Sequence, residues 1–172
     1  MIAKSCSSRK LRTNLGDPLM ELDSFDRQIL ALLQKDSRMP QRDISAHVKL
    51  SASAVNRRIA ALEAAGVIQR NVAVVDPAKV GKPITIIVAV SLESERLDLL
   101  DAARRRFVTS PAVQQVYYVT SEVDFVLVVN VADMAEYEAL TRELFFTDAK
   151  IKSFRTMVAM DRSKVSLAVD VG

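Results

Sequence analysis

Apolar residues in the first third of the chain recur at the three- and four-residue spacing of amphipathic helices. One stripe predicts a helix over residues 23–34, where Asp23 can cap the start and Asp26 lies in the acidic first turn. This stripe consists of Leu22, Phe25, Ile29, Leu32 and Leu33. Two further stripes predict helices over residues 41–48 and 52–65. We therefore expect three packed helices.

A short turn separates the second and third of these helices. Ser51 is placed to cap the third helix, and Gly66 supplies a break after it. Small, polar and basic side chains follow the cap. Two helices joined in this way are typical of the helix-turn-helix motif, in which the second helix enters a DNA major groove. We place this motif at about residues 41–60. The alternative interpretation is an ordinary packed pair of helices.

The exposed face of the third helix carries most of the side chains that we expect to contact DNA. Asn can pair with adenine, Arg with guanine or a phosphate, and small residues can lie against a thymine methyl group. A serine at the cap is expected to touch phosphate rather than read a base. The candidate DNA-binding residues are Gln41, Ser51, Ser53, Ala54, Asn56, Arg57 and Arg58. Which of the two arginines faces a base stays open.

After residue 83 the apolar pattern changes to a period of two. Residues 84–92 alternate apolar side chains on one face, which predicts a half-buried strand. Helical spacing returns in residues 94–107 and 133–146. Further strands are predicted at residues 113–120, 124–131 and 151–160. Two successive strand-helix-strand units predict a ferredoxin-like fold, in which two helices cover one face of a four-stranded antiparallel sheet. The fold class is α+β, a winged helix-turn-helix domain followed by a βαββαβ domain.

The second face of this sheet is not polar. Ile87, Ala89, Val126 and Val128 are expected to lie on it. An exposed apolar sheet face is typical of a surface that binds another protein. Another copy of the same domain is the simplest partner. We therefore expect a homo-oligomer, a dimer or larger.

The remaining segments set the domain boundaries. Residues 1–21 lack periodicity, carry Lys4, Arg9, Lys10 and Arg12, and are expected to form a flexible basic arm. The helix-turn-helix domain is assigned to residues 22–70, followed by a short wing strand and linker over residues 71–83. The sheet domain is assigned to residues 84–172, with a further strand-like segment at residues 164–171.

Composition and charge exclude several classes of function and favour DNA binding. The 172 residues include one cysteine and one histidine, which leaves almost no material for a disulfide, a metal site or a Ser-His-Asp triad. Residues 1–70 contain twelve Lys/Arg and seven Asp/Glu, whereas residues 71–172 contain twelve and fourteen. The positive charge thus accompanies the helix-turn-helix, as phosphate binding requires.

From these counts we expect no catalytic residue, no metal and no cofactor, and double-stranded DNA as a partner. Neither a signal-peptide core nor an apolar run long enough to span a membrane is present in the sequence. We therefore expect a cytoplasmic protein.

From Leu22 to Val171 the chain resembles the Lrp/AsnC family, the leucine-responsive or feast/famine transcription regulators. LDSFDRQILALLQKDSR and LSASAVNRRIAALEAAGVI resemble its opening and recognition helices, and VTSEVDFVL and FRTMVAMD fall at the effector signature of its ligand-binding (RAM) domain. The resemblance implies a two-fold dimer through the sheets, often building to octamers. It also implies an amino acid or similar small molecule bound between subunits. Lys49 and Ser121 stand where the family commonly has Gly.

The resemblance also implies the effector-binding residues. Among them, the Asp124 carboxylate could accept hydrogen bonds from the ammonium group of an effector. The candidates are Tyr118, Ser121, Glu122, Asp124, Met134, Met157, Val158 and Ala159.

Two other functions stay open at this point. One is a nucleoid-type protein that organises DNA without an effector. The other is an enzyme, because sirohaem decarboxylases resemble the same two-domain design. Such an enzyme would need histidines in its C-terminal half, and residues 71–172 contain none.

Overall fold

A computed structural model describes residues 20–94, 96–147 and 150–172. The described chain forms two compact units, one of residues up to Val72 together with Leu167–Gly172, the other of Ala73–Ser166. The predicted arm lies outside the described residues, apart from its last two positions. Among the residues that are described, no helix has the length and apolar character needed to cross a membrane.

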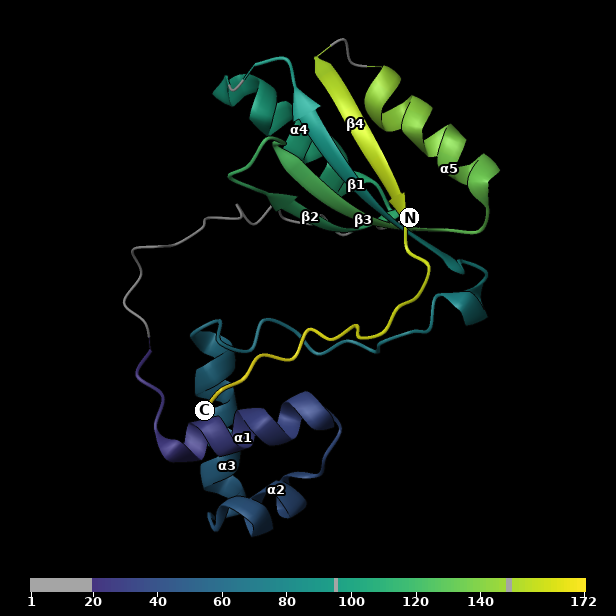
Figure 1. The fold of residues 1–172 in the computed structure, drawn as a ribbon. Helices are drawn as coiled ribbons and strands as arrows, with labels where there is room; N and C mark the ends of the chain where they lie inside the picture. Colours follow the sequence, from purple (N-terminus) through teal and green to yellow (C-terminus); the bar gives the residue numbers. More distant parts are fainter. Residues whose placement is uncertain (1–19, 95, 148–149) are drawn as a thin grey trace, which may run out of the picture. The chain divides into compact units, whose positions relative to one another are not determined.

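The helical unit contains the three predicted helices (Figure 1). They are α1 (Ser24–Lys35), α2 (Gln41–Val48) and α3 (Ala52–Ala64). At the start of α1, the Asp23 carboxylate accepts from the N–H of Asp26, and the Asp26 carboxylate accepts from the N–H of Asp23. Apolar side chains from all three helices form one buried cluster, which consists of Ile29, Leu30, Ile44, Val48, Val55 and Leu62.

The turn between α2 and α3 depends on a left-handed residue. Lys49 has φ 56° and ψ 40°, and it is the one non-glycine residue of the described chain with positive φ. Its N–H donates to the carbonyl of Ser45 and so closes α2. A side chain with a Cβ atom adopts this conformation at a cost of about 1 kcal/mol. Lys49, at the position where the resemblance implies Gly, therefore adopts a conformation that favours Gly.

The sheet unit has the predicted ferredoxin-like order. It contains β1 (Ile84–Leu92), α4 (Leu97–Thr109), β2 (Val113–Tyr118), β3 (Phe125–Val131), α5 (Met134–Thr141) and β4 (Ile151–Val158), with a short 3-10 turn at Ala78–Val80. The strands pair antiparallel in the order β2-β3-β1-β4. Helices α4 and α5 lie on the same side of the sheet (Figure 1).

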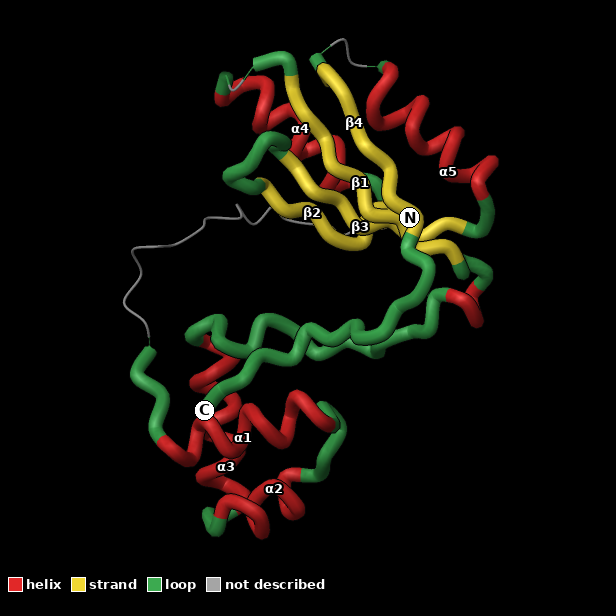
Figure 2. Tube along the Cα trace, in the orientation of Figure 1, coloured by secondary structure: helices red, strands yellow, loops and turns green. Residues whose placement is uncertain are grey.

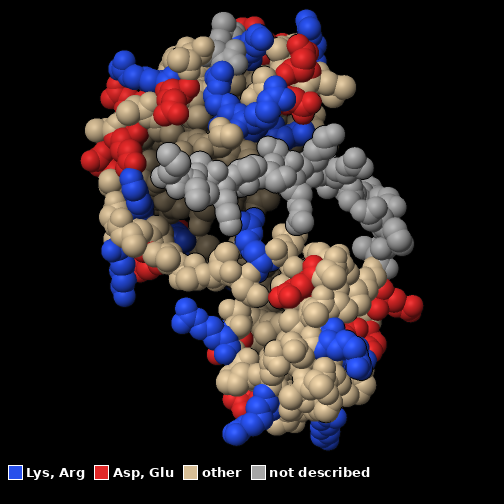
Figure 3. Space-filling view, turned by 180° about the vertical axis from the view of Figure 1, so that it is seen from behind, with Lys and Arg blue, Asp and Glu red and all other residues tan. Residues whose placement is uncertain are grey.

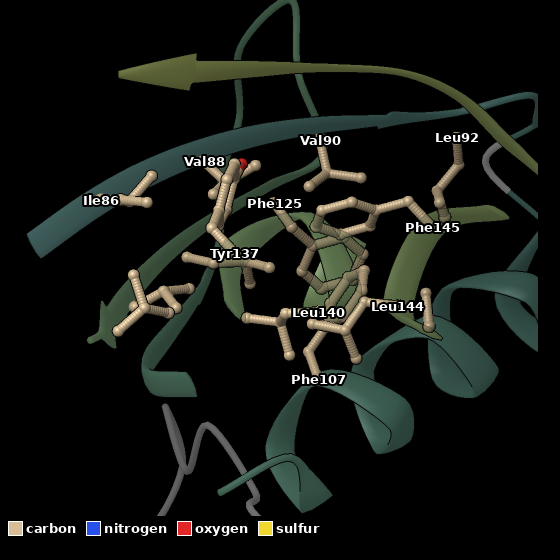
Figure 4. Close-up of a cluster of buried hydrophobic side chains, with 14 of the residues drawn as sticks. Ile86, Val88, Val90, Leu92, Phe107, Phe125, Tyr137, Leu140, Leu144 and Phe145 are labelled. Atoms are coloured by element: carbon tan, nitrogen blue, oxygen red, sulfur yellow. The ribbon is translucent and has the colours of Figure 1, made fainter. Parts of the chain in front are cut away.

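The core of the sheet unit lies between this sheet and its helices (Figure 4). Alternate residues of β1, Ile86, Val88 and Val90, are fully buried. The ring of Phe107 on α4 packs edge-on against Phe125 of β3, with ring centroids 5.4 Å apart. The predicted period-two pattern is thus confirmed for the central strands.

The predicted helix at residues 133–146 is divided. Regular α-helix ends at Thr141, and a π-helical turn, η2, follows at Arg142–Phe146. This turn leaves Phe145 buried and the adjacent Phe146 70% exposed. At the N-terminus of α5, the Asp133 carboxylate accepts from the N–H of Glu136 and so caps the helix. The Glu136 carboxylate accepts from the N–H of Ala132.

Two predicted strands are absent from the described residues. The wing segment before Asp76 and the segment at residues 164–171 both lack regular secondary structure, and Figure 2 draws them as loop. Apolar alternation predicts an extended chain, but a strand also needs a ladder of hydrogen bonds to a neighbour. In the C-terminal segment, Val169 and Val171 instead bond side chains of α1. Residues 167–172 accordingly belong to the helical unit and not to the sheet domain.

Candidate nucleic-acid interface and effector site

Helix α3 presents one exposed face that carries Ser53, Asn56 and Arg57. The opposite face holds Val55 and Leu62, which are fully buried in the helical core. Burial of one stripe fixes the rotation of the helix, so the three polar side chains point to solvent together. Ala54, also a candidate, is half-buried beside them.

Ser51 caps α3, as predicted. Its hydroxyl accepts from the N–H of Ala54 at 3.2 Å and lies 3.1 Å from the hydroxyl of Ser53. Ser51, Ala52 and Ser53 are exposed, so the N-terminus of the helix faces solvent, and a helix N-terminus favours a phosphate.

Gln41 and Asn56 are brought together from two helices. The side-chain amide of Gln41, at the start of α2, donates to the carbonyl oxygen of Asn56 at 2.9 Å. This bond orients the Asn56 carboxamide through its oxygen, on a side chain that is exposed. Asn with a fixed amide is the side chain that pairs bidentately with adenine.

The two neighbouring arginines have different environments. The Arg58 guanidinium lies 2.7 Å from the Asp26 carboxylate, 2.8 Å from that of Asp23, and over the ring of Phe25. It therefore joins α3 to α1 inside the unit. Arg57 is exposed and makes none of these contacts. Of the two predicted arginines, the structure leaves only Arg57 on the exposed face.

These contacts also change the titration of the groups. The hydrogen bond that the Arg58 guanidinium donates to the Asp26 carboxylate raises the pKa of Arg58, and its bond to the Asp23 carboxylate adds to this effect. The N–H of Asp26, followed by the guanidinium of Arg58, lowers the pKa of Asp23 below its ordinary value of 3.8.

The described helical unit is nearly neutral. Residues 20–72 and 167–172 contain eight Lys/Arg and seven Asp/Glu, a balance of +1. Figure 3 likewise shows basic and acidic side chains interspersed on the face it presents. The excess positive charge of residues 1–70 therefore comes mostly from the segment before residue 20, with four basic residues and one acidic residue.

Seven of the eight predicted effector residues fall into two groups at opposite ends of the sheet. Tyr118 ends β2, Ser121 and Glu122 are exposed in the following loop, and Asp124 precedes β3. The Asp124 carboxylate accepts from the N–H of Leu92 at 2.7 Å. One of its oxygens is thus used to close the end of β1.

The second group lies at the start of β1. Met157 and Val158 pair with Ile87 and Ile86, and the N–H of Ala159 donates to the carbonyl of Thr85. Because Ile86 and Leu92 are six residues apart along one strand, the two groups are separated by roughly 20 Å. Within a single copy of the chain they cannot line one pocket.

Met134 contributes to a groove of about 800 Å³ between α5 and β4. Its walls are formed by Met134, Tyr137, Glu138, Thr141, Arg142, Phe146 and Phe154. Tyr137 is held by a hydrogen bond to the hydroxyl of Thr156 at 2.6 Å, and burial raises the pKa of its phenol. No other predicted effector residue lines this groove.

The face of the sheet opposite the helices is apolar at its centre. Ile87, Tyr117 and Met157 are 36%, 51% and 43% exposed, and Val126 and Val128 are half-buried between them. The strand register places these residues on one side of all four strands of the sheet. This surface has the composition of an interface.

Comparison with known proteins agrees with both halves of this description. Residues 22–69 match the winged helix-turn-helix DNA-binding family, and residues 85–169 match the Lrp/AsnC ligand-binding domain. An HTH-type transcriptional regulator of Sinorhizobium fredii is 42% identical over 96% of both chains. The chain belongs to the Lrp/AsnC family of transcription regulators.

Solved structures show the same fold. An AsnC family transcriptional regulator from Agrobacterium tumefaciens is 32% identical, with a TM-score of 0.81 over 86% of this chain and 96% of that one. A transcriptional regulator from Neisseria meningitidis, described as a complex with L-Met, has the same TM-score at 23% identity, over 87% and 96%. The predicted fold class and family are thus confirmed.

Proposed function

We propose that this regulator reads DNA with the exposed face of α3, using Ser53, Asn56 and Arg57 for base edges and Ser51 with the helix N-terminus for phosphate. The observation that carries the proposal is the separation of the two arginines. Arg58 forms ion pairs with Asp23 and Asp26 at the start of α1. Arg57 instead lies on the exposed face of α3, beside the Asn56 amide that Gln41 orients.

The test is DNA binding by Arg57→Ala, with Arg38→Ala as a control that removes an equal charge outside α3. We expect Arg57→Ala to weaken binding to a selected operator by about 1–3 kcal/mol, and to relax the preference at one base pair. Arg38→Ala should cost less and leave base preference unchanged. Equal losses for both variants would show that Arg57 acts only through charge.

We further propose that the protein acts in the cytoplasm as a homo-oligomer assembled through the apolar sheet face. Two copies related by a two-fold axis would present two α3 helices to half-sites one or more helical turns apart. The apolar centre at Ile87, Val126 and Val128 supports this arrangement.

An amino acid or related molecule is proposed as the effector, bound between copies. The two groups of candidate residues lie at opposite ends of one sheet, so a pocket that uses both must be completed by a second copy. The L-Met complex of the Neisseria meningitidis regulator gives a first compound to test. A specific ligand should raise the melting temperature in proportion to the logarithm of its concentration. Absence of any shift across the amino acids would contradict this proposal.

A further inference from the structure

Helix α1 holds a segment from the far end of the chain. The Gln34 carboxamide donates to the carbonyl of Val169 at 2.9 Å, and the N–H of Val169 donates back to the Gln34 side-chain oxygen at 2.7 Å. Both bonds go to the main chain of Val169. A paired donor and acceptor of this kind imitates a neighbouring strand, so it recognises extended backbone rather than a particular side chain.

A second contact lies seven residues earlier on α1. The Arg27 guanidinium donates to the carbonyl of Val171 at 2.6 Å. Residues seven apart lie on one face of a helix, so Arg27 and Gln34 together form a continuous surface. The Val171 side chain is half-buried and packs against the apolar cluster of the helical unit. The segment therefore runs antiparallel to α1 and is bound at both ends.

We propose that this face of α1 is a main-chain binding site for Leu167–Gly172, and that it acts as a reversible latch between the DNA-binding unit and the sheet unit. The chain passes from one unit to the other at Val72/Ala73 and again at Ser166/Leu167. When the latch is closed, the sheet unit is therefore attached to the helical unit through two segments of chain instead of one.

The composition of the contact makes it reversible. Its contacts from Arg27 and Gln34 are three hydrogen bonds to main-chain atoms of Val169 and Val171, and Val171 is half-buried, while the side chains of Leu167 and Val169 are 77% and 70% exposed. Hydrogen bonds at exposed positions exchange readily with water and contribute little each. A change in the sheet unit that alters the position of Ser166 can open the latch without unfolding either unit.

The latch is tested in the full chain without DNA, by measuring hydrogen exchange of the Val169 amide by NMR. Gln34→Ala should accelerate this exchange about tenfold, because both bonds to Val169 are lost. Gln28→Ala is the matched control: Gln28 is also exposed on α1, and its side chain makes no hydrogen bond to the described residues. An unprotected Val169 in the unmutated chain, or equal exchange in both variants, would overturn the proposal.

A second measurement tests the consequence for DNA, which rests on the proposed function. Loss of the contact between Leu167–Gly172 and α1 gives α3 more conformational freedom, which must be lost again on binding. Gln34→Ala should therefore weaken operator binding about threefold, and Gln28→Ala should leave it unchanged. If the exchange result holds and affinity is unchanged, the coupling to DNA is refuted. If the unmutated chain binds no DNA, the proposed function fails, and the exchange measurement still decides whether the latch exists.

Discussion

The two units differ in how complete their sites are within one copy of the chain. In the helical unit the DNA-binding candidates other than Arg58 lie together on α3, its cap and the start of α2, and Gln41 and Asn56 are directly bonded. In the sheet unit the effector candidates divide between two ends of the sheet, and Asp124 is partly used to end β1. A helix can place a full recognition surface with residues close in sequence. A sheet distributes neighbours along its strands, so the proposed effector pocket would use residues from two copies.

The largest expected effect is on assembly, and it tests whether the sheet site depends on a partner. Val128→Arg places a charge at the centre of the apolar sheet face, where an interface would bury it without a counter-ion. We expect self-association to weaken at least about 100-fold, measured by light scattering over a concentration series. Val108→Arg, at an exposed position on α4, should leave the mass unchanged.

If Val128→Arg remains a dimer, the sheet face is not the interface, and the separation of the effector residues needs another explanation. The helical unit of the Val128→Arg variant serves as an internal control. Because its site is complete in one copy, the α3 surface should stay folded in the monomer, with unchanged resonances for Asn56 and Arg57.

The next effect concerns stability and contrasts the neighbouring arginines. Arg58→Ala leaves the Asp26 carboxylate, which is 6% exposed at its side chain, without its ion-pair partner. We expect a loss of about 2–3 kcal/mol in the free energy of unfolding of the helical unit. Arg57→Ala should change it by less than about 0.5 kcal/mol. Urea unfolding monitored by circular dichroism measures both, and equal losses would contradict the division of roles.

A smaller effect on stability is expected when the pH is lowered, because Asp23 becomes protonated. Its pKa is lowered in the folded state by the N–H of Asp26 and by Arg58. A carboxylate with a depressed folded pKa stabilises the fold above its unfolded pKa, near 3.8, and loses this contribution as pH falls through the folded value. The melting temperature should therefore fall below about pH 4, and less steeply in Asp23→Asn than in the unmutated chain.

The smallest effect is local to the turn between α2 and α3. Lys49→Gly removes the strain of a Cβ atom at φ 56° but raises the entropy of the unfolded chain. We expect a net stabilisation of about 0.5–1 kcal/mol in urea unfolding. Lys49→Ala keeps the Cβ atom and should give no gain. A gain in both variants would mean that the lysine side chain, rather than the backbone, is unfavourable.

Much of the fold could be predicted because its signals are periodic and local. The three helices and the four strands lie within a few residues of the predicted ranges, since each buries one face whose spacing is visible in the sequence. The π-turn at Arg142–Phe146 could not be predicted. Adjacent phenylalanines fit a continuous helix equally well, and only the packing of Phe145 inward and Phe146 outward distinguishes the two.

The site was predictable only in part, for a related reason. Adjacent Arg57 and Arg58 cannot be told apart by spacing, because the distinction depends on Asp23 and Asp26 from another helix. The alternating valines of the C-terminal segment correctly indicate an extended chain. They do not indicate that α1, through the side chains of Gln34 and Arg27, takes the place of a neighbouring strand.

The position of Val171 has a consequence for synthesis on the ribosome. The three helices emerge before any strand of the sheet, whereas the valine that packs against their core emerges after all four strands. Domains fold as units during translation, with the N-terminal one first. The DNA-binding unit can therefore form early but acquires its last core contact only after the sheet domain has been translated. A product truncated within the sheet domain would carry the recognition helix without that contact.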